Sequence, residues 1–300
     1  MGNSRWDSGA YTSYARTIRA KSQDEIFTNT DGMHPDLDPS KIAFRESVDS
    51  VANPKSTPII IGVDETGSMG HLAVEIIKNG LGVIVQGIYD RKPVTDPHIL
   101  LAAIGDASCD RAPLQVTQFE ADVSITKQIE KFYIEGNGGG NGGESYPIAW
   151  WFAANKTKCD CMSKRGRKGY LFTIGDECPI RLGKDEIKRH LGGSAQSDMT
   201  VEQLLDEVKK KWNVFHLIIP TSATSDQGAV KVWRKLLGER AVEVTDHKKL
   251  GEVIVSIMQV NEGQDADEVA ASWDGSTSVA VRNAVTAVAK RSGNTKVVTL

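Results

Sequence analysis

The chain has 300 residues, of which 40% are apolar and 25% are charged, and its net charge is −3. These totals fit a globular protein with one large domain and extensions, or with two small domains. The negative balance argues against nucleic acid as a partner, because phosphate binding requires a concentrated positive face. The densest basic stretch, residues 156–168, is interrupted by Asp160, and we expect it to be a solvated loop.

The sequence carries no recognisable membrane or export signal. No segment approaches the ~18 continuous apolar residues that a transmembrane helix requires. The first residues lack the apolar core of a secretory signal, and Trp6 stands where a myristoylation pattern has serine or threonine. Four cysteines in a chain of this length do not indicate a disulfide scaffold. We therefore expect a cytoplasmic protein with reduced thiols and no membrane partner.

Residues 1–55 are polar, contain several turn signals and have no sustained hydrophobic period. This composition predicts an N-terminal extension that either wraps the following domain or stays mobile. Parts of the extension are expected to pack, because it contains these aromatic and aliphatic residues: Trp6, Tyr11, Tyr14, Ile26, Phe27, Ile42 and Phe44.

From residue 56 to residue 260, apolar runs typical of buried strands alternate with helical patterns. The continuous runs predict strands over 59–63, 99–104, 169–174, 214–219 and 241–244. The alternation predicts an α/β fold with a doubly wound, mostly parallel sheet and helices on both faces.

Two features of this domain are less regular. Residues 114–119 alternate as a half-buried edge strand would. The helical pattern over 72–88 contains Gly80, Gly82 and Gly87, which cost stability inside a helix. Close approach of this helix to the sheet would explain the three glycines.

After the domain, residues 261–300 form a C-terminal extension. The acidic, turn-rich segment 261–277 is expected to be a linker. An amphipathic helix over 278–290 and a short strand over 297–300 are expected to follow.

Three oxygen-bearing side chains, Asp64, Thr66 and Ser68, follow the first predicted strand at alternate positions. A further acid, Asp176, follows the strand at 169–174. The carboxyl ends of parallel strands meet at one edge of the sheet, where ligands bind in α/β folds. Hard oxygen ligands with this spacing suit Mg²⁺ or Mn²⁺ better than zinc. The alternative interpretation is that the segment only caps the following helix.

The pattern Asp64-x-Thr66-x-Ser68 after a buried strand, with a later strand ending in Gly-Asp176, resembles the metal-ion-dependent adhesion site of von Willebrand factor A domains. The similarity is to the intracellular, prokaryotic or phage-like type, and it covers roughly residues 56–260. The resemblance implies that Thr66 and Ser68 bind the metal directly. It also implies that Asp64 and Asp176 hold coordinated waters and neutralise charge.

One further ligand departs from the family pattern. Many members supply a threonine from a later loop, and the corresponding loop here, residues 136–145, contains none. We expect Glu144 in its place, with Ser145 or Asn141 as alternatives. The competing interpretation of Glu144 is an acid favoured by the dipole at a helix N-terminus. If Glu144 bound the metal directly, its charge would weaken affinity for an acidic partner. Asp106, after the strand at 99–104, is expected to begin a turn.

Other chemistry is weakly indicated. The glycine loop at 136–143 ends without the lysine of a phosphate-binding loop, so no nucleotide site is expected. Trp150 and Trp151 are expected to be core residues. A zinc site would have to use Cys159, Cys161, Cys178 and either Cys109 or His190. We expect ordinary thiols instead, because the Cys-x-Cys spacing is tighter than is usual for zinc and the sequence does not specify the fourth ligand.

Together these features indicate a non-enzymatic module that binds a protein, with a partner carboxylate completing the coordination of Mg²⁺ or Mn²⁺. Cytoplasmic members of the resembled family commonly work with ring ATPases of the AAA+ type, so we expect such a partner. The alternative is an assembly protein whose terminal extensions join neighbouring copies, with the oligomeric state left open. A metal-dependent hydrolase, with Glu65 or Glu177 as general base, is a third interpretation for which no nucleophile is placed.

Overall fold

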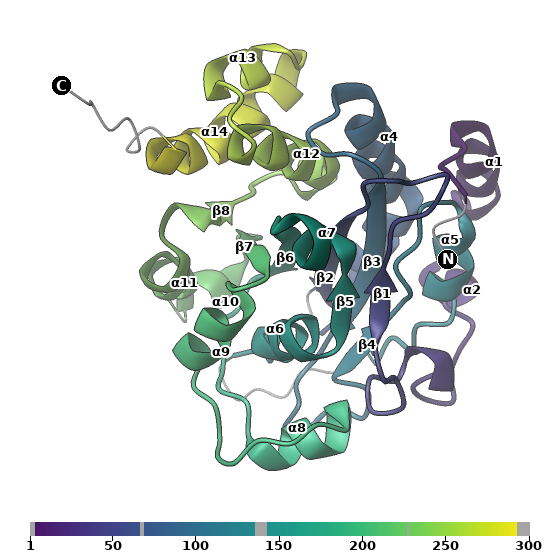
Figure 1. Ribbon diagram of the computed structural model, residues 1–300, viewed down its shortest axis with the longest axis vertical. Coiled ribbons are helices and arrows are strands. Elements are labelled where there is room, and N and C mark those ends of the chain that lie inside the picture. Colours follow the sequence, from purple (N-terminus) through teal and green to yellow (C-terminus); the bar gives the residue numbers. More distant parts are fainter. Residues whose placement is uncertain (1–3, 67–68, 136–142, 227, 293–300) are drawn as a thin grey trace.

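The computed structural model describes residues 4–66, 69–135, 143–226 and 228–292. Within these ranges a six-stranded sheet crosses the molecule, in the order β4-β3-β2-β6-β7-β8 (Figure 1). Every neighbouring pair is parallel except β3 and β4, which are antiparallel. The strands are β2 (Thr57–Asp64), β3 (Pro97–Ile104), β4 (Leu114–Val116), β6 (Gly169–Gly175), β7 (Trp212–Ile218) and β8 (Ala241–Glu243).

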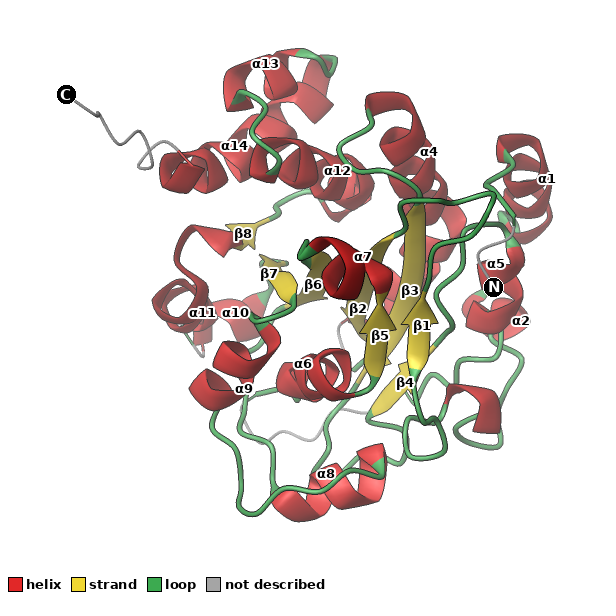
Figure 2. Cartoon of the chain, in the orientation of Figure 1, coloured by secondary structure: helices red, strands yellow, loops and turns green. Residues whose placement is uncertain are grey.

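The two faces of the sheet carry separate hydrophobic cores, because successive strand residues point to opposite sides. Ile59 and Ile61 of β2 belong to one core, and Ile60 belongs to the other. Figure 2 shows helices on both sides of the strands. The first core is covered by α3 (Gly70–Glu75), α4 (Leu81–Arg91), α5 (Ser124–Ile129) and α12 (Leu250–Asn261). The second is covered by α6 (Tyr146–Asn155), α8 (Lys184–Leu191), α9 (Val201–Val208) and α11 (Ala229–Leu237). The predicted doubly wound α/β fold is therefore confirmed.

Parts of residues 4–50 pack against the sheet domain. They contain α1 (Ser8–Ile18), α2 (Gln23–Ile26) and β1 (Arg45–Ser47), which pairs in parallel with β5 (Thr157–Cys159) as a separate two-stranded sheet. Tyr11, Ile26 and Phe27 are buried, as expected, whereas Phe44 is 44% exposed.

The helix predicted over 72–88 is interrupted by a π-helical turn, Ile76–Gly80, between α3 and α4. The expectation that its glycines bring it close to the sheet is wrong for two of them. A Cβ on Gly82 would lie 2.1 Å from the Tyr11 ring of α1, and one on Gly87 would lie 3.0 Å from Val255 of α12. These two glycines therefore allow α1 and α12, rather than the sheet, to pack closely against α4.

The edge strand β4 is shorter than predicted and fully buried. The segment after α5 lies against this strand, since the Gln115 side chain donates to the Tyr133 carbonyl at 2.8 Å and accepts from the Tyr133 amide at 2.9 Å. The basic stretch 156–168 is also not a simple loop, since it forms β5 and the helix α7 (Asp160–Arg165).

The C-terminal segment is more helical than expected. The predicted linker 261–277 contains α13 (Ala266–Ala271) and the start of α14 (Gly275–Ser292), because Val269, Ala270 and Val281 join the first core. The strand expected over 297–300 lies outside the described residues. The remaining helix is α10 (Ser222–Asp226). Among the described helices, none has the length and apolar character needed to cross a membrane.

Candidate functional site

The carboxyl ends of β2 and β6 lie side by side at the centre of the sheet. From β2 the chain proceeds outward through β3 and β4, and from β6 it proceeds the other way through β7 and β8. Their junction is thus the point at which the winding reverses, where α/β folds form ligand sites. Asp64 is the last residue of β2 and Asp176 follows β6, so the fold brings these two predicted site residues to one edge.

Asp64 is fully buried and accepts three hydrogen bonds. One carboxylate oxygen accepts from the Thr66 amide at 2.9 Å and the Thr66 hydroxyl at 2.6 Å. The other accepts from the Tyr146 hydroxyl at 2.6 Å. Burial raises the pKa of Asp64 to about 7, and the charge of Asp176 adds to this rise, although the three hydrogen bonds oppose it.

Glu144 lies beside Asp64 and Thr66, two residues before α6 begins. Its backbone is held by a bridge to the segment after β6, with the Glu144 amide donating to the Cys178 carbonyl at 2.9 Å. The residue is 2% exposed, and its Oε2 atom has no hydrogen-bond partner among the residues that the structure describes. Burial, reinforced by the charge of Asp64, raises the pKa of Glu144 to about 9, while a hydrogen bond with the Thr66 side chain lowers it. Asp64, Thr66 and Glu144 therefore form one compact group.

The alternative ligand Ser145 is engaged elsewhere. Its hydroxyl accepts from the Ala107 amide at 2.9 Å and donates to Asp106 at 3.3 Å. Asp106 also accepts from the amide and the hydroxyl of Ser108, both at 2.8 Å. Asp106 thus begins a turn, as predicted. The other predicted positions, Ser68 and Asn141, lie outside the described residues.

Two hydroxyl groups complete the site, and the sequence pattern did not single out either. Tyr146, the first residue of α6, links the strand ends because it donates to Asp64 and accepts from the Glu177 amide at 3.4 Å. Thr221, just beyond β7, donates to Asp176 at 2.5 Å. The sequence signal that could have identified Thr221 is its position just after a third parallel strand. The role of Tyr146 depends on Gly175, where a Cβ would lie 2.0 Å from its hydroxyl.

The residues proposed for hydrolysis are differently placed. Glu65 is buried, and its Oε1 accepts from the Gln115 side chain at 3.3 Å. Burial raises its pKa well above the ordinary value, which favours the neutral carboxyl. The carbonyl of Glu177 accepts from the Trp233 indole at 2.8 Å. Trp150 and Trp151 are buried core residues, as predicted.

All four cysteines are free thiols. Burial raises the pKa of Cys159 to about 12 and that of Cys161 to about 11. Over the residues that the structure describes, no three His, Cys, Asp or Glu side chains come together as a metal-binding group. The zinc alternative therefore has no support, and a cation at the sheet edge would need hydroxyl ligands as well as carboxylates.

No family model and no curated protein matches the chain. The chain is similar in structure to the pilus adhesin SpaC from Lactobacillus rhamnosus GG in an open conformation, with a TM-score of 0.47 and 10% identity over 69% of this chain and 30% of the adhesin. A second crystal structure of the same adhesin gives a TM-score of 0.49 and 10% identity over 69% of this chain and 31% of the adhesin. It is also similar to a von Willebrand factor type A protein from Catenulispora acidiphila, with a TM-score of 0.38 and 13% identity over 79% of this chain and 52% of that protein. The chain thus spans less than two thirds of each of these proteins, and TM-scores below 0.5 add nothing to what the strand order shows.

Proposed function

We propose that this chain binds another protein through a divalent cation, Mg²⁺ or Mn²⁺, at the carboxyl edge of the sheet. The observation that supports this most directly is the buried Oε2 atom of Glu144 beside Asp64 and Thr66, which no described residue pairs by a hydrogen bond. Among the described residues, no cationic side chain forms a salt bridge with either carboxyl. Buried carboxylates without a counter-charge are costly, and a bound cation would offset that cost.

The donor set fits a hard cation, because every candidate ligand atom is oxygen. Thr66 and Glu144 would hold the cation directly. Asp64 and Asp176 would neutralise charge through coordinated waters, and Ser68 would add a hydroxyl. A bound cation would offer one open coordination position, which an acidic side chain of the partner can fill. Binding rather than catalysis is the proposed outcome.

Within this class we propose an AAA+ ATPase as the first partner to test, on the basis of the resemblance carried by the Asp64 motif. The assembly alternative has less support. The described parts of both extensions pack within the chain, α1 against α4 and α14 against α12, rather than projecting from it.

The test is affinity capture from lysate with the immobilised chain in Mg²⁺, in EDTA, and as Asp64→Ala. Asp206→Ala is a matched control, because Asp206 is an exposed acid on α9. A protein that the wild type and the control retain only in Mg²⁺, and that Asp64→Ala loses, supports the proposal. Direct titration with Mg²⁺ and Mn²⁺ by calorimetry is the second measurement. Equal capture in all conditions, or no cation binding, would refute it.

A further inference from the structure

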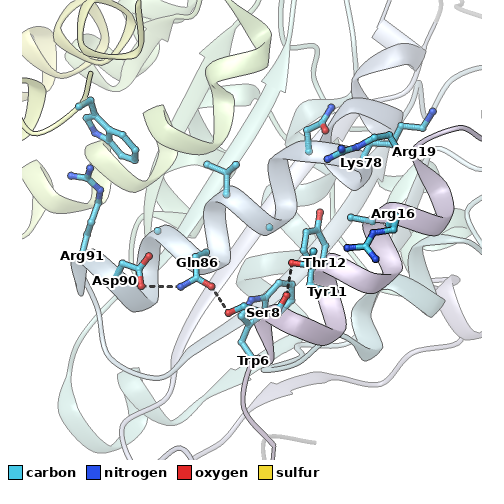
Figure 3. Close-up of a pocket in the computed structure, with 16 residues that line it drawn as sticks. Trp6, Ser8, Tyr11, Thr12, Arg16, Arg19, Lys78, Gln86, Asp90 and Arg91 are labelled. Atoms are coloured by element: carbon cyan, nitrogen blue, oxygen red, sulfur yellow. Dashed lines mark hydrogen bonds between the residues drawn. The ribbon is translucent and has the colours of Figure 1, made fainter. Parts of the chain in front are cut away.

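A groove of about 970 Å³ lies between α1 and α4, away from the sheet edge (Figure 3). One side consists of pairs of residues about one helical turn apart, at 78–79 in the π-helical turn Ile76–Gly80 and at 82–83, 86–87 and 90–91 on α4. The α1 side is formed in the same way by residues 8, 11–12, 15–16 and 19. The groove is therefore bounded by one face of each helix.

The floor of the groove is largely apolar. Trp6, Tyr11 and Ala15 line it from the N-terminal segment, Val83 lines it from α4, and Trp273 lines it from the turn after α13. Polar contacts at the middle are already satisfied, because Ser8 donates to Gln86 at 2.5 Å and Gln86 donates to Asp90 at 2.8 Å. An occupant would thus contact the floor mainly through apolar groups.

The rim is basic although the whole chain has a net charge of −3. Arg16 on α1 and Arg19 at its C-cap are exposed, and neither forms a salt bridge with a described residue. Arg91, at the end of α4, stacks over Trp273 with its guanidinium 3.4 Å from the ring centre. The charged lining residues are Arg16, Arg19, Lys78, Arg91 and Asp90. The positive excess favours an acidic occupant.

The shape of the groove favours a helix. The residues that line it on the π-helical turn and α4 extend from 78 to 91, which corresponds to about 20 Å at about 1.5 Å per residue. An amphipathic helix of about four turns spans that length, with apolar residues at i, i+3, i+4 and i+7 on the floor. A nucleic acid is less suitable, because a long polyanion would also meet the net negative charge of the chain.

We propose that this groove binds an acidic amphipathic helix of a partner protein, through apolar contacts with the floor and ion pairs with Arg16 and Arg19. None of its lining residues belongs to the candidate metal site. Binding here is therefore independent of the cation, and the two proposals can fail separately.

The probe is a fluorescein-labelled 16-residue peptide with leucines along one helical face and glutamates on both flanks. Its affinity for the full chain is measured by anisotropy in EDTA. The test variant is Arg16→Glu/Arg19→Glu. Lys188→Glu/Arg189→Glu is the control, because these exposed residues lie in the last turn of α8 and give the same change in charge. The milder Arg16→Gln/Arg19→Gln serves if the reversal perturbs α1.

We expect the Kd to rise about tenfold or more in the test variant and to change less than about twofold in the control. A photo-reactive peptide should crosslink to α1 or α4. Four results would overturn the proposal: no saturable binding, equal binding of a peptide with lysine in place of glutamate, equal weakening by the control variant, or crosslinks confined to other elements. Displacement by a DNA oligonucleotide, or self-association abolished by the same variant, would assign the groove to another occupant.

Discussion

Asp64→Asn should stabilise the protein at pH 8 when no divalent cation is present. In the folded protein the pKa of Asp64 is raised to about 7, from an ordinary value of 3.8, chiefly by burial. An unfolded chain releases this proton near pH 4, whereas the folded chain retains it until about pH 7. The carboxyl therefore makes the wild type progressively less stable as pH rises through that window, and the loss is complete above it.

The magnitude follows from the same values. The rise of the Asp64 pKa from 3.8 in the unfolded chain to about 7 in the folded protein corresponds to about 4 kcal/mol of unfolding free energy. This is an upper figure, because the folded site can relax around the charged carboxylate. Asparagine has nearly the same shape and does not titrate. Its carbonyl oxygen can still accept from Thr66, and the Tyr146 hydroxyl can accept from its amide. We therefore expect the variant to exceed the wild type by up to about 4 kcal/mol at pH 8 and to match it near pH 4.

The assay is urea unfolding in EDTA at pH 4, 6 and 8, followed by tryptophan fluorescence. The difference between variant and wild type reports Asp64 together with Glu144, whose pKa the charge of Asp64 raises, because the remaining carboxyls titrate in both proteins. Repeating the pH 8 series with Mg²⁺ should stabilise the wild type and leave the variant unchanged, since only a folded state that binds the cation gains from it. A variant less stable than the wild type at pH 8, or a difference that does not vary with pH, would refute the reasoning.

Three further outcomes are expected. Tyr146→Phe removes a hydrogen bond to the buried carboxylate of β2, worth about 1.5–3 kcal/mol, and should weaken Mg²⁺-dependent stabilisation in a thermal shift assay; an unchanged Mg²⁺ response would count against its positioning role. Gly82→Ala places a Cβ 2.1 Å from the Tyr11 ring and should cost about 1–3 kcal/mol in urea unfolding, whereas a neutral effect would mean that α1 moves freely. Arg165→Ala breaks the pair with Asp49, whose pKa the guanidinium holds well below its usual range. The wild type should therefore be more stable than this variant above about pH 4, and the difference should shrink as pH falls below that value; a constant difference would exclude the ion pair as its cause.

Much of the fold could be read directly from local pattern. The continuous apolar runs ending at Asp64 and Gly175 identify buried parallel strands, because a strand covered on both faces needs no polar alternation. Once the sheet is parallel, the acids after those strands must share an edge. The convergence of Asp64 and Asp176 therefore follows from topology alone.

Other features depend on contacts between distant parts of the chain. Nothing near Tyr146 indicates that its hydroxyl reaches Asp64, 82 positions earlier, and nothing near Gly82 indicates that the ring of Tyr11 fills its missing Cβ. Likewise, nothing near Ser145 indicates that Ala107 and Asp106 occupy its hydroxyl.

The sequence by itself thus determined the alternation of strands and helices, the winding of the sheet and the edge at which acids gather. Those properties follow from hydrophobic period and chain connectivity, which are local. Only the tertiary structure decided which hydroxyl groups meet the buried acids, which oxygen of Glu144 has no partner in the described part of the chain, and that α1 and α4 enclose a basic-rimmed groove. These depend on side-chain packing between segments that no local pattern relates.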